Sequence, residues 1–307
     1  MKKNKYLLIA ALPLLLVSCN KKDSVGIPTG EKVSETETYT VLTKASEATS
    51  KQDSFGFKLT SYFDSKTEAA YTQGTVKQTS DTSTNVKLDA NFGVKGFKEE
   101  KLKDVEASLV TSGSLELKAS NTNLNTSLGA GVYLEDGTLY CNLENLAPLL
   151  ESVTIPSAYL TSLKFKTTIP SDVDNSLKEI LEDDTWSELI EEIKEESKSF
   201  ETLKTKDGDY AYVFELDLEK LASSSSTSFS GDVTGSVKCS LLFNDKGFKN
   251  YYLTMDVASK FSVDDGTNEN SITTSTSVKG EVKLSFLYGD EVSVEKVKDP
   301  SSFVEQK

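Results

Sequence analysis

The sequence contains no arginine and no histidine, so all 34 of its basic side chains are lysines. Histidine is the commonest metal ligand and the side chain that most often moves protons near neutral pH. Without it, the histidine-based pairs that activate serine and cysteine nucleophiles are excluded. The sequence also lacks the guanidinium group of arginine, which binds phosphate and carboxylate groups through pairs of hydrogen bonds. We therefore expect a protein that is not an enzyme and has no catalytic residues.

Other sequence patterns that carry chemistry are poorly represented. The Ser-x-x-Lys sequence Ser293 to Lys296 lies in a predicted strand, where residues three apart face opposite sides. The acidic turn 264–269 has oxygen ligands but lacks the spacing of a calcium-binding loop. Cys141 and Cys239 are too far apart for a zinc motif, and no glycine pattern indicates a nucleotide site. We expect no metal ion and no noncovalent cofactor.

Negative charge dominates the composition, with 48 acidic and 34 basic side chains and a formal net charge of −14. Proteins that bind nucleic acid concentrate cations on one surface, where they displace the counterions of the phosphates. The lysines of this sequence form no such cluster. We expect no nucleic-acid partner.

The longest apolar run, Tyr6 to Val17, follows three lysines at positions 2, 3 and 5. About twelve apolar residues are too few to span a bilayer as a helix, which needs about twenty. A basic segment followed by a short apolar run is typical of a cleavable export signal. Residues 1–18 are therefore predicted to be a signal peptide.

The signal ends in Leu16-Val17-Ser18-Cys19, which resembles the lipobox of bacterial lipoproteins. This resemblance implies cleavage before Cys19, a diacylglyceryl group on its thiol, and anchoring to the extracytoplasmic face of the cell membrane. Two acyl chains give stable anchoring, whereas one gives only marginal binding. Removing residues 1–18 leaves 31 basic and 48 acidic side chains, a formal charge of −17. An ordinary secretory signal with a chance cysteine is the alternative.

The two other cysteines, Cys141 and Cys239, both lie in alternating apolar segments. Exported proteins form disulfides, but free cysteines are also common as small buried apolar residues. A disulfide and two free thiols therefore both remain open, as does the oligomeric state.

Residues 19–33 contain turn-forming residues without periodicity and are predicted to be a flexible tether. Ser34 to Glu37 matches a capping box, and apolar residues at helical spacing follow it, so we expect a helix over about 34–51. From Phe55 onward, apolar and polar residues alternate as in antiparallel strands with one wet face. Asp136-Gly137 is predicted to be a tight hairpin turn.

Residues 144–205 interrupt the strands with helical patterns, the clearest of which begins at Trp186 with an apolar and an acidic face. Alternation resumes at Tyr210 and continues to about Val297. Residues 86–98 and 237–249 resemble each other, which would fit two related halves on either side of the interruption or a recurring hairpin sequence.

This order of elements, with the late sequences Tyr288 to Val292 and Asp299-Pro300, resembles the LolA and LppX/LprG family of lipid-binding lipoproteins. The resemblance implies an α+β fold over residues 34–303, followed by a tail at 304–307. In that fold a strongly curved antiparallel β-sheet forms a half-barrel, and helices cover its concave face.

The same resemblance implies a membrane-anchored, non-enzymatic lipoprotein that binds or carries a lipid or another hydrophobic ligand. The expected cavity lies between the helices and the sheet, and its candidate lining residues are Trp186, Leu189, Ile190, Ile193, Phe214, Phe243 and Phe286. The alternative is a structural or adhesive surface lipoprotein whose own side chains fill that space. The two hypotheses differ in whether an apolar cavity of several hundred cubic ångströms is present.

Overall fold

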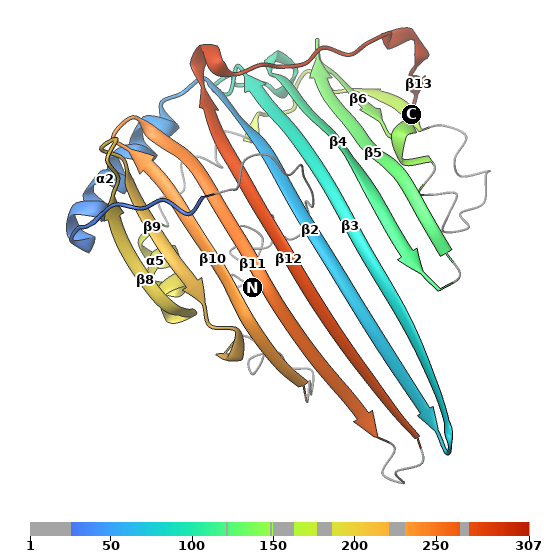
Figure 1. The fold of residues 1–307 in the computed structure, drawn as a ribbon. Coiled ribbons are helices and arrows are strands. Elements are labelled where there is room, and N and C mark those ends of the chain that lie inside the picture. The colour runs from blue at the N-terminus through green and yellow to red at the C-terminus, as the bar shows by residue number, and fades with distance from the viewer. Residues whose placement is uncertain are drawn as a thin grey trace.

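Thirteen strands lie side by side in one open sheet (Figure 1). The computed structural model describes residues 26–120, 122–147, 149, 163–176, 186–220, 231–264 and 270–306, and only the backbone of residues 186, 187, 231, 263, 264 and 270. Across the sheet the strands are β1 (Glu31–Lys32), β8 (Ser197–Lys204), β9 (Tyr210–Leu216), β10 (Gly231–Asn244), β11 (Gly247–Asp264), β12 (Asn270–Tyr288), β2 (Ser54–Gln73), β3 (Val76–Lys95), β4 (Glu106–Ala119), β5 (Thr122–Glu135), β6 (Thr138–Asn142), β7 (Lys164–Thr168) and β13 (Val304–Glu305).

The sheet is antiparallel, as predicted, apart from the parallel pairing of β13 with β7. The first run of strands (β2 to β7) and the second run (β8 to β12) meet where β12 pairs with β2, from Asn270 opposite Gln73 to Tyr288 opposite Phe55. Two-residue strands from the two ends of the described chain, β1 and β13, form the outermost members. Very short edge strands limit unwanted pairing with other chains.

The predicted helix near the N-terminus is confirmed as α2 (Glu35–Ser50). Ser34 is its N-cap, and the Ser34 hydroxyl accepts a hydrogen bond from the Glu37 backbone N–H at 3.2 Å. The predicted hairpin at Asp136-Gly137 is also confirmed, because both residues have positive φ, 48° and 68°, and connect β5 to β6.

One face of the sheet, which we call the core face, carries most of the buried apolar side chains. Residues directly opposite each other on neighbouring strands share a face, and alternate residues lie on opposite faces. On β2, Leu59 and Phe63 are buried on the core face, whereas Lys58 and Lys66 are exposed on the other, which we call the polar face. Helix α2 packs on the core face over β8 to β11, and α5 (Trp186–Glu195) contacts β8. The 3₁₀ turns are η1 (Leu102–Asp104), η2 (Glu144–Leu146), η5 (Gly289–Glu291) and η6 (Pro300–Ser302).

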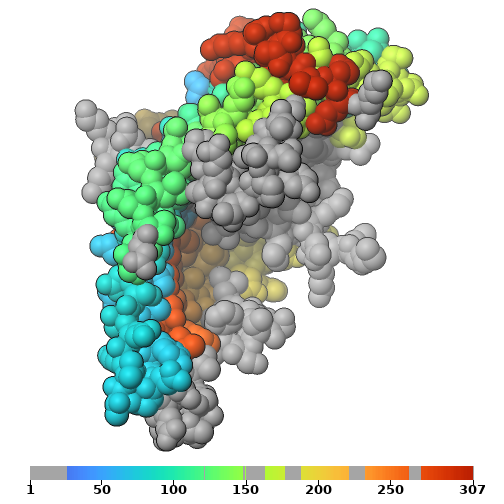
Figure 2. All heavy atoms as spheres, turned by 90° about the vertical axis from the view of Figure 1, so that its right-hand side faces the viewer, coloured from blue at the N-terminus to red at the C-terminus, as the bar shows by residue number. Residues whose placement is uncertain are grey.

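The long central strands continue beyond this core. At the far end of β3, every residue from Val76 to Asp81 is exposed, although successive residues face opposite sides of the sheet. Both faces are therefore in contact with solvent there, and this end of the sheet is a single layer. Figure 2 shows the cyan residues of β3 extending below the broader upper part of the molecule. We call this end the distal end, and the end that carries α2 the proximal end.

The C-terminal segment crosses the proximal end of the polar face (Figure 1). Gly93 permits this crossing, because a Cβ atom on residue 93 would lie only 2.3 Å from the Ser293 carbonyl oxygen. The Glu295 N–H donates to the Ser108 hydroxyl at 2.9 Å, and Lys296 pairs with Glu106 at 2.6 Å. Residues 292–297, where the alternating pattern predicted the end of the last strand, form no strand and instead run in an extended conformation across the sheet. The expected tail at 304–307 includes β13.

The predicted fold class, an α+β half-barrel with helices over its concave face, is wrong. The described helices α2 and α5 pack only at one side, over β8 to β11, and the rest of the sheet has no described helix of comparable length on it. The stretch predicted as helical, residues 144–205, contains the strands β7 and β8 in addition to α5. The β-branched and aromatic residues of these two strands, such as Phe165 and Phe200, favour a pleated sheet over a helix.

Cys141 on β6 and Cys239 on β10 are both free thiols on distant strands of the sheet. Cys239 is 2% exposed, and burial raises the pKa of its thiol to about 11. Burial also raises the pKa of the half-buried Cys141 thiol. Of the two alternatives, the structure therefore has two free thiols. Their raised pKa values keep both thiols protonated near neutral pH, so both should react slowly, because the thiolate is the reactive form.

We predict that native protein carrying Cys19→Ser reacts slowly with iodoacetamide near pH 8, since both remaining thiols stay protonated there. After unfolding in denaturant without reductant, two thiols per chain should become alkylated, as counted by mass spectrometry. Alkylation that requires prior reduction would show a disulfide and contradict the structure.

Candidate functional site

The apolar side of α5 faces the core, as its sequence pattern indicates. Ile190 is 6% exposed, and Leu189 and Ile193 are half-buried. Lys194 of α5 pairs with Glu35 of α2 and, within α5, with Glu191. Ile190 and Ile193 pack against two neighbouring groups of sheet residues. The side chain of Trp186, also nominated for the cavity, lies outside the described residues.

Three of the nominated residues meet in one cluster beneath α2. Ile190 packs with Phe243, which is fully buried, and Phe286 packs against the edge of the same cluster. The Phe286 ring centroid is 5.8 Å from that of Phe248, which is 6.4 Å from Phe243. Such spacings are those of aromatic rings in direct contact. These side chains are in contact with one another between α2 and the sheet.

Two further nominated residues, Phe214 and Ile193, belong to the larger central cluster, whereas the half-buried Leu189 belongs to neither cluster. Phe214 is 8% exposed and packs with Leu253 and Val282, and Ile193 lies against the same group. Phe200 connects the two clusters, since its ring centroid is 6.4 Å from that of Phe214 and 5.3 Å from that of Tyr212. Five of the seven residues nominated for the cavity thus lie in two adjoining apolar clusters.

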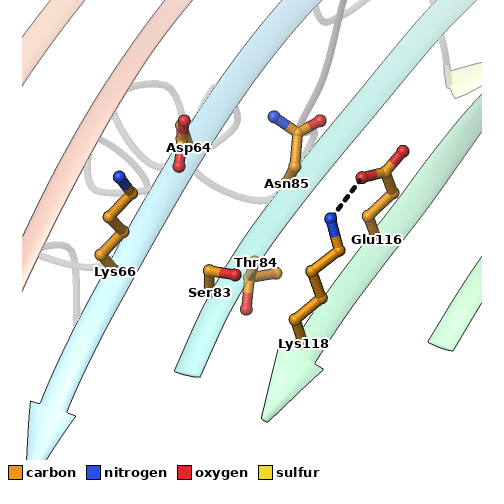
Figure 3. Close-up of a pocket in the computed structure, with 7 residues that line it drawn as sticks. All are labelled: Asp64, Lys66, Ser83, Thr84, Asn85, Glu116 and Lys118. Atoms are coloured by element: carbon orange, nitrogen blue, oxygen red, sulfur yellow. Dashed lines mark ion pairs between the residues drawn. The ribbon is translucent and has the colours of Figure 1, made fainter. Parts of the chain in front are cut away.

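A different concavity lies on the polar face toward the distal end, and the sequence patterns did not single it out. It has a volume of about 210 Å³ and lies over three neighbouring strands (Figure 3). Its lining residues are Asp64 and Lys66 from β2, Ser83, Thr84 and Asn85 from β3, and Glu116 and Lys118 from β4. The register explains the grouping, because Asp64, Asn85 and Glu116 lie opposite one another in one row across the strands.

The charges of this groove balance one another. Lys118 pairs with Glu116 at 3.8 Å, and Asp64 accepts a hydrogen bond from the Tyr62 hydroxyl at 3.2 Å. Burial, and then the negative charge of Asp64, raises the pKa of Tyr62. The groove is smaller than the 300–1,000 Å³ typical of small-molecule sites, and its lining is polar. The sequence does contain a signal for this groove, because Asp64 and Lys66, and likewise Glu116 and Lys118, are charged residues two positions apart in predicted strands and therefore share a face.

No group of three metal-ligating side chains is found within the part of the chain that the structure describes. None of the described helices is long and apolar enough to cross a membrane. The groove on the polar face presents hydroxyl, amide, carboxylate and ammonium groups to solvent.

No protein-family model matches the chain, and no curated protein matches it. Among solved structures, the outer membrane protein OprG from Pseudomonas aeruginosa is 9% identical, with 78% of this chain and 99% of OprG covered, at a TM-score of 0.19. A Pseudomonas aeruginosa FadL homologue is 9% identical, with 77% and 90% covered, at a TM-score of 0.14. These TM-scores are too low to carry an argument about fold or function.

We predict that Phe243→Ala lowers the free energy of unfolding by about 3–5 kcal/mol, because it removes a fully buried ring from a packed core. Urea unfolding measures this change. As a control, Val76→Ala at the exposed distal end should change stability by less than about 0.5 kcal/mol. A loss at Phe243 as small as at Val76 would contradict the packed core and favour a cavity.

Proposed function

We propose that the protein is a non-enzymatic surface lipoprotein, anchored to the membrane through a diacylglyceryl group on Cys19. Its sheet would serve a structural or adhesive role without a small-molecule ligand. The observation that carries the proposal is the single-layer distal end, where Val76 to Asp81 expose both faces of β3 to solvent. A ligand carrier needs an enclosed apolar space, whereas an exposed polar layer offers surface for contact.

The packing at the proximal end favours the same hypothesis. A lipid carrier would use the apolar residues under the helices to line a cavity, but Ile190, Phe214 and Phe243 are in contact with their neighbours and between 0 and 8% exposed. The resemblance to half-barrel carriers is not part of this proposal, because the helices do not cover the sheet as that resemblance requires.

The tether joins the sheet at the proximal end. The Val33 N–H donates to the Thr202 carbonyl oxygen at 3.1 Å, and the Thr202 hydroxyl donates to the Val33 carbonyl oxygen at 2.6 Å. Cys19 precedes Gly26, the first described residue, by only seven positions, which span at most about 25 Å. A lipid on Cys19 would therefore hold the proximal end close to the membrane.

The distal end lies at the opposite end of the long strands. Strand β2 has 20 residues, and at about 3.3 Å per residue it spans about 66 Å. The turn between Gln73 and Val76 would thus be available far from the bilayer. A negatively charged body would also be repelled by anionic headgroups, which favours a position away from the surface. This geometry supports presentation of the distal end to the surroundings.

We predict that Cys19→Ser moves the protein from the membrane fraction to the soluble fraction in the producing bacterium, since the thiol that carries both acyl chains is removed. Ser18→Ala is the matched control, because it keeps a small residue before the cysteine and should leave the protein membrane-bound. The wild-type protein, purified in detergent and extracted with organic solvent, should release no stoichiometric lipid. Membrane retention of Cys19→Ser would contradict the anchor, and one bound lipid per chain would contradict the ligand-free role.

A further inference from the structure

Two rows of residues, one acidic and one basic, border the groove on the polar face (Figure 3). Across β2, β3 and β4, the acidic row is Asp64, Asn85 and Glu116, and the basic row, next toward the distal end, is Lys66, Ser83 and Lys118. The members of each row are direct cross-strand partners, and residues two apart on one strand share a face about 6.6 Å apart. Two carboxylates in one row therefore lie beside two ammonium groups in the next.

This order of charges makes the polar face complementary to a second copy of itself. A two-fold axis between the two rows, perpendicular to the strands and above the sheet, places the acidic row of one copy over the basic row of the other. Asp64 then faces Lys66 of the second copy, and Glu116 faces Lys118 of the second copy. On β12, β2, β3 and β4, no two like charges face each other in this arrangement. Each favourable pair occurs twice.

Other charges of the same face have no ion-pair partner in the single chain. Glu68 and Asp81 lie directly opposite each other on β2 and β3, and like charges at such positions destabilise a sheet. Among the described residues, neither of these carboxylates forms an ion pair, and Lys66 and Lys87 form none either. The same axis places Lys87 of the second copy over Asp81. A second copy thus supplies a cation to this pair of carboxylates.

The complementary area is accessible in the single chain. Lys66, Asp81 and Lys118 are all exposed. The C-terminal segment crosses the polar face at Gly93, eight residues from Asn85 and thus about 26 Å away along β3.

The area is also large enough for a weak dimer. Ten residues on each of four strands, β12 and β2 to β4, cover about 33 Å by 19 Å, or about 600 Å² per copy. The two copies together would bury about 1,200 Å², which is the lower limit of a specific interface. Two sheets packed in this way keep their strands within about 30° of each other.

Charge favours a second copy at this place. Two chains of net charge −14 repel each other, so they can approach closely only where the local charge is low. Around the groove, the polar face of β2 to β4 carries four carboxylates and three ammonium groups. These residues are Asp64, Glu68, Asp81 and Glu116, and Lys66, Lys87 and Lys118.

We propose that two copies of the protein associate polar face to polar face, about the axis between the rows of Asp64 and Lys66. An axis perpendicular to the strands reverses the strand direction, so the two proximal ends lie at opposite ends of the dimer. If each proximal end carries a membrane anchor, the dimer connects two membranes. This last consequence rests on the proposed function, whereas the pairing of the two faces does not.

A charge exchange between Asp81 and Lys87 tests the arrangement. In the dimer, Asp81→Lys places lysine opposite Lys87 of the second copy, and Lys87→Glu places glutamate opposite Asp81. The double variant Asp81→Lys with Lys87→Glu restores opposite charges at both places. The two residues lie six positions apart on β3, about 20 Å, so they form no ion pair within one chain. Recovery in the double variant can therefore come only from a second copy.

We predict that the full chain carrying Cys19→Ser forms dimers in sedimentation equilibrium at about 100 μM, and that added salt weakens them. Each single variant should raise the dissociation constant at least about tenfold, because repulsion replaces attraction twice. The double variant should return to within about threefold of the parent, and circular dichroism should show the same fold in all four chains. A monomeric parent, single variants that dimerise like the parent, a double variant as weak as the single ones, or masses beyond the dimer would overturn the proposal.

The connection of two membranes is tested with the native lipidated chain in phosphatidylcholine vesicles. Vesicles that carry the parent should cluster in a turbidity assay, those that carry Asp81→Lys should not, and the double variant should restore clustering. Protein that floats with the vesicles and dimerises in solution but does not cluster them would overturn the connection. Protein that fails to float would contradict the anchor of the proposed function, whereas sedimentation would still decide the pairing of the two faces.

Discussion

The pairing of β12 with β2 is the interaction on which the rest of the structure depends. All nineteen residues of β12 take part, and the pair joins strands separated by about two hundred positions in the sequence. Without it, the first run of strands and the second run would be two sheets, each with another long exposed edge. With it, Val282 of β12 and Leu59 of β2 enter one central core.

The length of these strands divides the molecule into two structurally different parts. At the proximal end, apolar residues of the core face are buried against α2, α5 and one another, which provides the stability of the fold. Toward the distal end β3 and β12 are rich in serine and threonine, and interstrand contacts such as Thr67 to Thr276 at 3.2 Å replace core packing. Core packing and the solvent-exposed single layer thus lie at opposite ends of one sheet, and β1 pairs with β8 at the packed end.

Local features of this fold were predictable from the sequence, and its long-range features were not. The cap at Ser34 and the turn at Asp136-Gly137 depend on residues a few positions apart, and both are as predicted. The β12–β2 register depends on residues far apart in the sequence. Every strand shows the same alternating pattern, so the pattern does not indicate which strands pair or in which register. For the candidate site, apolar spacing selected Ile190 and Phe243 as candidate cavity-lining residues, and both lie in one buried cluster. It could not distinguish side chains that line a cavity from side chains that fill it, because both are apolar and inward-facing.

The most direct measurement is a disulfide cross-link between the two runs of strands. In a chain with Cys141→Ser and Cys239→Ser, we predict that Thr67→Cys and Thr276→Cys form a disulfide on mild oxidation, because these residues are direct cross-strand partners on one face. The linked chain would migrate differently on a non-reducing gel. Thr67→Cys with Ser275→Cys, shifted by one residue to the opposite face, should not link. No link in the first pair, or equal linking in both, would contradict the single sheet and its register.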